Sequence, residues 1–147
     1  MEKSIADLFE IIKNGMELGN IDIVNYPPLT LAYIGDAIYE IVVRTYVVVN
    51  KNTQVNKLHK ATSNLVKAQA QSDMIKSLYN ELTDEEYRVF KRGRNAKSVS
   101  VAKNASVTEY RTATGFEALM GYLYLNNESE RMIELIKKGL YNISRNS

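Results

Sequence analysis

A chain of 147 residues lies within the usual size range of one domain, so residues 1–147 are expected to fold as a single domain. The sequence has no cysteine and one histidine, His59, which excludes disulfides and thiolate chemistry and leaves little for a zinc site or a histidine-based relay. It has no run of about 18 apolar residues and no basic leader followed by an apolar stretch, so no membrane attachment is expected. Carboxylates remain as the candidate reactive groups.

Charge is segregated along the chain, although the net charge is only +2. Residues 1–50 hold seven acids and three bases, residues 51–67 hold four lysines and no acid, and residues 87–111 hold seven bases and one acid. A local excess of positive charge attracts a polyanion even when the total charge is small. The two basic segments therefore indicate a polyanionic partner.

Apolar residues recur every three or four positions over most of the chain, as at Ile34, Ile38 and Ile41. This spacing predicts an all-α fold. The β-branched run at 47–49 could also form a strand, but no neighbouring segment with an alternating pattern offers it a partner. The expected helices cover about residues 3–17, 29–48, 54–79, 83–94, 108–126 and 128–144.

Several short signals support the breaks between these helices. Pro27 and Pro28 disfavour a helix before them and preset the backbone for the start of the next one. Residues 83–86 and 127–130 have the spacing of a capping box. Residues 95–107 are rich in asparagine, serine, lysine and small side chains, which predicts an exposed loop that is either mobile or functional.

One acidic residue stands in an apolar stretch of the second expected helix. Asp36 is the only acid between Asp22 and Glu40. A carboxylate in a largely buried helix is costly unless it is hydrogen-bonded, protonated or bound to a cation. Gly35, directly before it, lowers helix stability by about 1 kcal/mol relative to alanine. The combination indicates that space is kept for something close to the helix backbone.

A second acid has a similar setting. Glu117 is the only acid between Glu109 and Glu128 and lies among small and apolar residues. Two such acids can converge on one hard divalent cation such as Mg²⁺, which takes oxygen ligands and keeps several waters. Each acid alone could instead face solvent or accept a local hydrogen bond. Residues 114–117 even have capping-box spacing, so Glu117 could simply close the start of its helix.

Three segments in order resemble the ribonuclease III family. Residues 33–37 resemble the signature motif of its catalytic domain, and residues 115–125 resemble its second acidic helix. Residues 91–98 resemble a basic stretch of the Mini-ribonuclease III branch, which lacks a separate double-stranded-RNA-binding domain. The match covers about residues 25–140. The resemblance implies a ribonuclease III-like bundle of about six helices and a cytoplasmic endoribonuclease.

The resemblance also implies the chemistry. Asp36 and Glu117 would be the catalytic and metal-binding residues, holding Mg²⁺ or Mn²⁺ in its place. Hydrolysis of double-stranded RNA would leave a 5′ phosphate and a 3′ hydroxyl, and the expected substrate is the large-subunit (23S) ribosomal RNA precursor. The larger family has four acids per site, whereas this chain has Ala32 and Thr114 at the other two positions. We therefore expect a reduced acidic site.

The basic stretch is expected to contact RNA. A protein reads an A-form duplex mainly through its shape, phosphates and 2′-hydroxyls. Arginine and lysine suit phosphates, while asparagine and serine can reach sugars. The alternative is a non-catalytic helical protein that binds double-stranded RNA through the same loop. The expected RNA-binding residues are Arg92, Arg94, Asn95, Lys97, Ser98 and Lys103.

A homodimer is the last expectation that the resemblance carries. Members of the family act as two-fold dimers whose two sites cut opposite strands. Tyr33 matches an aromatic position that inserts into the partner subunit. Helix 29–48 is therefore expected to form much of the dimer interface.

Overall fold

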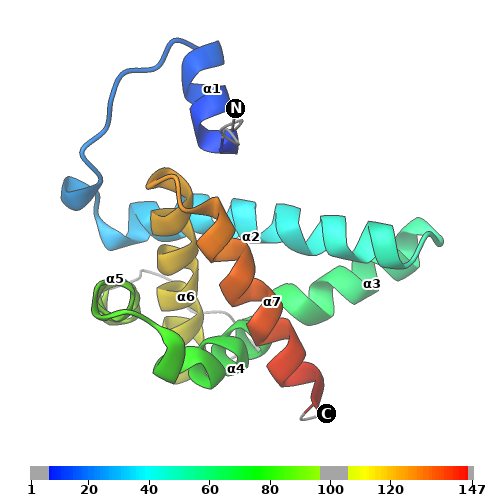
Figure 1. Ribbon diagram of the computed structural model, residues 1–147. Helices are drawn as coiled ribbons and strands as arrows, with labels where there is room; N and C mark the ends of the chain where they lie inside the picture. Colours follow the sequence, from blue (N-terminus) through cyan, green and yellow to red (C-terminus); the bar gives the residue numbers. More distant parts are fainter. Residues whose placement is uncertain (1–6, 97–105, 146–147) are drawn as a thin grey trace.

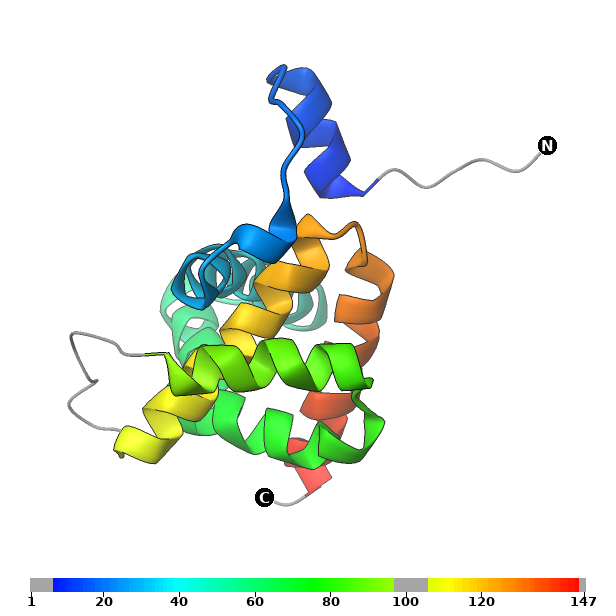
Figure 2. The same cartoon turned by 90° about the vertical axis from the view of Figure 1, so that its left-hand side faces the viewer.

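The computed structural model describes residues 7–96 and 106–145, and within these ranges it contains helices and no β-strand (Figures 1 and 2). The all-α expectation is confirmed. No helix in the described part of the chain is long and apolar enough to cross a membrane. The elements in order are α1 (Leu8–Gly15), η1 (Ile23–Asn25), α2 (Pro28–Asn50), α3 (Val55–Val66), α4 (Ala68–Leu78), η2 (Tyr79–Glu81), α5 (Asp84–Asn95), α6 (Val107–Leu125) and α7 (Ser129–Arg145).

Helix α6 lies at the centre of the bundle, with α2, α4, α5 and α7 packed around it (Figures 1 and 2). Its side chains are buried on nearly every side, which explains why its sequence lacks a polar face. Phe116 on α6 meets Tyr39 on α2 edge to face, with ring centroids 5.1 Å apart. The core therefore forms around the same two helices that carry the candidate acids.

Helix α2 is a single long helix that begins and continues as the sequence indicates. Pro28 occupies its first position, where a proline costs no hydrogen bond. The run at 47–49 is helical, so its reading as a strand is wrong. Val43 and Val47 lie one turn apart on the buried face of α2. Burial against the bundle therefore overrides the β preference of the valines.

The expected helix at 54–79 is wrong in one respect, because it is divided into α3 and α4. Lys67 between them has an extended backbone, with φ −65° and ψ 156°. The carbonyls freed by the break have side-chain partners: the Tyr39 hydroxyl donates to Leu65 O at 2.8 Å and the Gln71 amide donates to Val66 O at 2.7 Å. These bonds stabilise a bend that could not be predicted from the sequence, because no glycine or proline lies at it.

Helix α1 is shorter than the expected 3–17 and lies beside the bundle (Figures 1 and 2). The helix spans Leu8–Gly15, and residues 3–6 lie outside the described ranges. None of its residues is buried. Phe9 packs edge to face on Tyr124, with centroids 5.8 Å apart. The contacts of α1 are therefore few, and its position depends on them.

Of the two expected helix caps, one is confirmed and one is wrong. Thr83 and Glu86 form the capping box of α5 with bonds of 3.1 and 2.9 Å. Asn127 instead takes a positive φ of 59° after α6 and donates its side-chain amide to Glu10 at 2.9 Å. Helix α7 begins two residues later, at Ser129.

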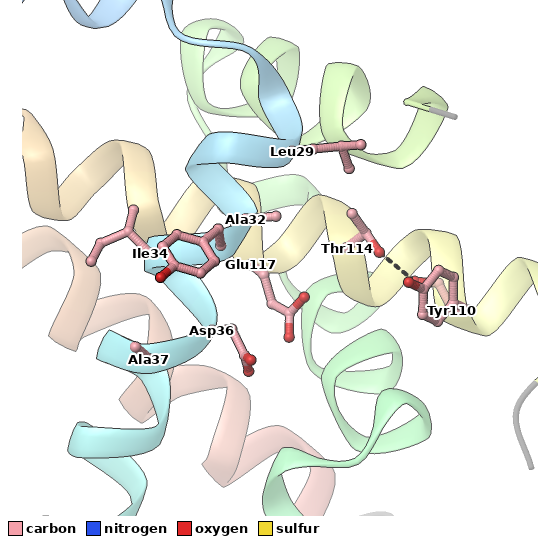
Figure 3. Close-up of a pocket in the computed structure, with 9 residues that line it drawn as sticks. Leu29, Ala32, Ile34, Asp36, Ala37, Tyr110, Thr114 and Glu117 are labelled. Carbon is pink, nitrogen blue, oxygen red and sulfur yellow. Dashed lines mark hydrogen bonds between the residues drawn. The ribbon is translucent and has the colours of Figure 1, made fainter. Parts of the chain in front are cut away.

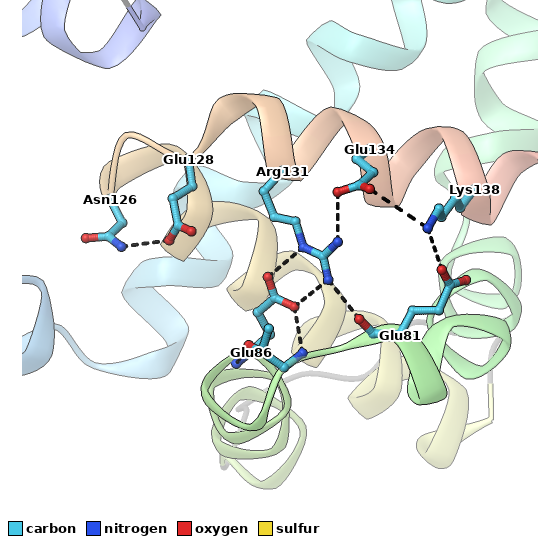
Figure 4. A network of polar contacts seen from close by, with 8 residues as sticks. Glu81, Glu86, Asn126, Glu128, Arg131, Glu134 and Lys138 are labelled. Carbon is cyan, nitrogen blue, oxygen red and sulfur yellow. Dashed lines mark hydrogen bonds and ion pairs between the residues drawn. The ribbon is translucent and has the colours of Figure 1, made fainter.

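A buried ion pair joins α5 to α7 on the side of the bundle shown in Figure 4. Glu86 is 5% exposed, and the Arg131 guanidinium donates to both of its oxygens at 2.8 and 2.9 Å. Arg131 also donates to Glu81 O at 2.8 Å. The hydrogen bonds from Arg131, more than those from Thr83, hold the pKa of Glu86 below its usual range against the opposing effect of burial. The pair therefore fixes α7 against the start of α5.

Candidate active site

The two candidate acids are brought together by a close crossing of α2 and α6. Gly35 and Gly121 lie at this crossing with no side chain between the two backbones. A Cβ on Gly35 would overlap the carbonyl oxygen of Glu117, and a Cβ on Gly121 would overlap that of Leu31. The space that the sequence indicated beside Gly35 is therefore occupied by the backbone of α6.

Asp36 and Glu117 extend from the two helices toward the same open space in Figure 3. They line a pocket with a volume of about 450 Å³. The remaining lining comes from the first half of α2 and from α6, at Leu29, Ala32, Tyr33, Ile34, Ala37, Tyr110 and Thr114. Two acids separated by 81 positions in the sequence therefore share one pocket.

Burial was expected for both acids, and the structure buries only one of them, Glu117, and that one only partly. Asp36 is exposed on α2, whereas Glu117 is partly buried. Burial is the main cause that raises the pKa of Glu117 to about 8, and the negative charge of Asp36 adds to it. A hydrogen bond with Asp36 also raises this pKa, while a hydrogen bond from Gln71 lowers it. The hydrogen bond between the two carboxyl groups indicates that they share a proton. A cation bound between them would neutralise the same negative charge, so the shared proton would no longer be needed.

The capping alternative for Glu117 is wrong. Helix α6 starts at Val107, and Ser106 forms its capping box with Glu109. Thr114 is two turns inside the helix, and its hydroxyl donates to Tyr110 O at 3.0 Å. Glu117 is therefore an interior helical residue whose side chain is not used to close the helix.

The two positions where the larger family has further acids also line the pocket. Ala32 and Thr114 contribute a methyl group and a hydroxyl there. No group of three or more histidine, cysteine, aspartate or glutamate side chains occurs in the part of the chain that the structure describes. Mg²⁺ is commonly held by one or two carboxylates together with waters and substrate phosphate oxygens. The donor set fits a divalent cation bound by Asp36 and Glu117 alone.

Gln71 is a residue of this site that the sequence analysis missed. It is 1% exposed, and its amide nitrogen lies 3.4 Å from Glu117 Oε2. Met74, Ile75 and Leu78 follow on the same buried face of α4. The sequence signal for Gln71 is a polar residue at a position where the helical repeat of apolar residues predicts a buried side chain. This signal indicates a functional role only when its partner, Glu117, is known.

Part of the expected RNA-binding set lies at the end of α5. Arg92 and Asn95 are exposed, and Arg94 is partly exposed with its guanidinium 5.5 Å from the centre of the Phe90 ring. Arg94 also donates weakly to Asn95 Oδ1 at 3.4 Å. The other three expected residues, Lys97, Ser98 and Lys103, lie outside the described ranges.

Tyr33 is the most exposed large apolar residue near the pocket. Its side chain is 81% exposed, and it lines the same pocket as Asp36. A tyrosine at this exposure buries almost none of its ring within the chain. The side chain is therefore available to a partner surface.

Comparisons with known proteins agree with this fold. The Ribonuclease III domain family matches residues 29–128. Mini-ribonuclease 3 of Clostridium tetani is 56% identical over 84% of this chain and 82% of its own length, and that of a Thermoanaerobacter species is 45% identical over 93% and 94%. The crystal structure of protein FN1578 from Fusobacterium nucleatum covers 84% of this chain and 98% of its own, with a TM-score of 0.74 and 32% identity.

The helical bundle is thus that of a ribonuclease III-type nuclease domain. The chain belongs to the ribonuclease III family, in the group formed by the Mini-ribonuclease 3 proteins. It is accordingly an endoribonuclease. The family that residues 33–37 and 115–125 resemble in the sequence analysis is therefore confirmed as the family of this chain.

Proposed function

We propose that this chain cleaves double-stranded RNA in a Mg²⁺-dependent reaction, with Asp36 and Glu117 as the catalytic and metal-binding residues. The observation that carries the proposal is the meeting of these two carboxyl groups in one pocket at the α2–α6 crossing. When bound there, Mg²⁺ or Mn²⁺ would supply Lewis-acid stabilisation of phosphate charge and an activated water. The products are a 5′ phosphate and a 3′ hydroxyl.

The chain's own residues have separate parts in this proposal. Glu117 is held rigidly by the buried helix α6, while Asp36 on α2 faces solvent and is open to substrate. The α2–α6 backbone contact fixes the spacing between them. Such pre-organisation matters because a displacement of about 1 Å in a catalytic group can lower the rate by about a hundredfold.

The end of α5 and residues 97–103 form the proposed RNA contact. Arg92, Arg94 and Asn95 are the described members of the proposed set. Its other members, Lys97, Ser98 and Lys103, lie outside the described part of the chain. Positive side chains beside an acidic pocket suit a phosphate backbone whose scissile bond enters the pocket. Family membership and the paired acids favour cleavage over the non-catalytic alternative.

The proposed active form is a homodimer made through α2. Leu29, Tyr33, Ala37 and Ile41 lie one turn apart along one face of α2, and all four are exposed. A stripe of this kind on one helix matches the self-complementary patch that a two-fold interface requires. Asp36 lies next to this stripe, so each pocket would open beside the interface. We further propose a single domain, a cytoplasmic location and the large-subunit (23S) ribosomal RNA precursor as substrate.

One assay tests the proposal. Duplex RNA is incubated with the protein in Mg²⁺ and in EDTA, beside a single strand of the same sequence. Cleavage confined to the duplex with Mg²⁺ is expected, with products that a 5′-phosphate-dependent exonuclease degrades. Equal cleavage in EDTA would contradict the metal requirement, and binding without cleavage under all conditions would favour the non-catalytic alternative.

A further inference from the structure

Gln71 is a buried polar side chain beneath the acidic pocket. Its Nε2 donates to Val66 O at 2.7 Å and to Glu117 Oε2 at 3.4 Å, so one amide group links the α3–α4 break to the acid on α6. The side chain is 1% exposed. The amide group is itself shielded from bulk water, which strengthens its polar interactions.

The orientation of the amide is determined by its neighbours. Val66 O and the Glu117 carboxylate are both acceptors, so only the NH₂ end of Gln71 can face them. The opposite end, Oε1, is buried without a hydrogen-bond partner in the described part of the chain. A buried acceptor of this kind destabilises the fold. Methionine or leucine would fill similar space without that cost. The bond to Val66 O supports the α3–α4 break, but that role does not require the second contact of the amide, with Glu117 Oε2.

Contacts at the α3–α4 break hold Gln71 under Glu117. The α3–α4 break frees the Val66 carbonyl, and the Tyr39 hydroxyl fixes the adjacent Leu65 carbonyl to α2. Tyr39 in turn packs on Phe116, the neighbour of Glu117 on α6. The residue next to Val66 is therefore anchored to α2 directly and to α6 through the Tyr39–Phe116 contact.

We propose that Gln71 is a positioning residue that holds the Glu117 carboxylate for metal binding. The amide holds one carboxylate oxygen, Oε2, and so limits rotation of the Glu117 side chain. Among the described residues of α4, no other side chain forms a hydrogen bond with Glu117. Groups that orient metal ligands in this way typically change metal affinity or activity by about 10- to 100-fold when they are removed. The inference rests on the proposed function, because it takes Glu117 as a metal ligand.

Gln71→Met tests the role by removing the amide while keeping the length of the side chain. Binding of Mn²⁺ to the RNA-free protein is followed by electron paramagnetic resonance, and the free energy of unfolding is measured in urea. We expect about tenfold weaker Mn²⁺ binding. Stability should change little, because the lost bond to Val66 O is offset by removal of the unpartnered Oε1. The Mg²⁺ concentration for half-maximal cleavage should rise similarly, while the rate at saturating Mg²⁺ recovers most of the wild-type value.

Ser72→Ala is the matched control. Ser72 is the next residue on α4, fully buried, and its hydroxyl also has no partner in the described part of the chain. Its substitution should leave Mn²⁺ affinity unchanged. Unchanged Mn²⁺ affinity in Gln71→Met, or an equal loss in Ser72→Ala, would overturn the proposal.

A measurement on the unaltered protein covers the case in which Gln71→Met does not fold. The side-chain amide resonances of Gln71 are followed by NMR during titration with Mg²⁺. A shift of these resonances at the same Mg²⁺ concentration as the Glu117 signals is expected, and no shift would contradict the proposal. If wild-type protein binds neither Mg²⁺ nor Mn²⁺, the proposed function fails, and the role of Gln71 fails with it.

Discussion

Gly35 on α2 lies directly against the backbone carbonyl of Glu117 on α6. This contact makes the distance between the two helices as short as their backbones allow, and it places Asp36 beside Glu117. The spacing of the two acids therefore depends on the absence of a side chain at Gly35, the position before Asp36.

Gly35→Ala should destabilise the protein and lower cleavage. The added methyl group must push α2 away from α6, which typically costs about 1–3 kcal/mol, and the better helix propensity of alanine returns about 1 kcal/mol. Urea unfolding and the cleavage rate are the measurements. Gly15→Ala is the control, since nothing lies within 4 Å of its Cβ, and it should be neutral or slightly stabilising. A fully active and stable Gly35→Ala variant would contradict the close crossing.

Asp36→Asn should reduce duplex cleavage to background while helix content and most RNA binding remain. The amide keeps the shape of the side chain but removes the charge that a cation requires. Cleavage assays, circular dichroism and electrophoretic mobility shifts measure the three properties. Glu40→Gln is the control one turn further along α2, where Glu40 pairs with Arg44 at 2.8 Å and does not line the pocket. It should retain activity, whereas an active Asp36→Asn variant would refute the assignment.

Arg92→Gln combined with Arg94→Gln should weaken RNA binding and flatten its salt dependence. Each lost phosphate contact lowers the slope of log affinity against log salt by about one. Affinities at several salt concentrations provide the measurement, and circular dichroism checks the loss of the Arg94–Phe90 contact. Lys137→Gln with Arg145→Gln on α7 removes the same charge elsewhere and should leave the slope nearly unchanged. Equal slopes for both double variants would argue against contact at the end of α5.

Tyr33→Ser should weaken the proposed homodimer. An exposed aromatic at the centre of an interface commonly contributes about 2 kcal/mol or more to binding, so dissociation should increase at least tenfold. Sedimentation over a concentration series measures it. Tyr141→Ser is the matched control, because Tyr141 is also an exposed tyrosine, 59% exposed, but lies on α7 and away from the proposed interface. It should leave dissociation unchanged. A wild-type chain that sediments as a monomer yet makes staggered cuts would exclude the dimer.

Arg131→Met should destabilise the protein at pH 7 by about 3 kcal/mol, because it leaves the buried Glu86 carboxylate without its partner. The pKa of Glu86 is lowered in the fold, so its contribution is complete above the unfolded value of 4.5. The contribution decreases as the pH falls through 4.5 toward the lower folded pKa. The stability difference between wild type and Arg131→Met should therefore narrow below about pH 4.5.

Urea unfolding at pH 7 and at pH 3.5 measures this difference. Lys138→Met is the control, because Lys138 pairs with Glu81 at the exposed surface, and surface pairs contribute little. It should show little change at either pH. A difference for Arg131→Met that stays constant between the two pH values would assign its effect to lost packing rather than to the charge of Glu86.

The sequence by itself determined the all-α fold, most helix boundaries and the family, because these follow from local periodicity, proline and capping signals, and motif order. Asp36 and Glu117 could be selected as lone acids among apolar residues. That selection could not distinguish an exposed acid from a buried one. Burial depends on which helix face the bundle covers, and the sequence analysis expected it at both acids although Asp36 is exposed.

Only the tertiary structure decided the rest. The break at Lys67 depends on side chains from α2 and α4 that satisfy the freed carbonyls, and no local signal marks it. The meeting of Asp36 with Glu117 depends on two glycines from different helices lying at one crossing. Gln71 became part of the site through a hydrogen bond to a residue 46 positions away. Contacts between distant segments are set by packing of the whole chain, which is why these features could not be inferred from neighbouring residues.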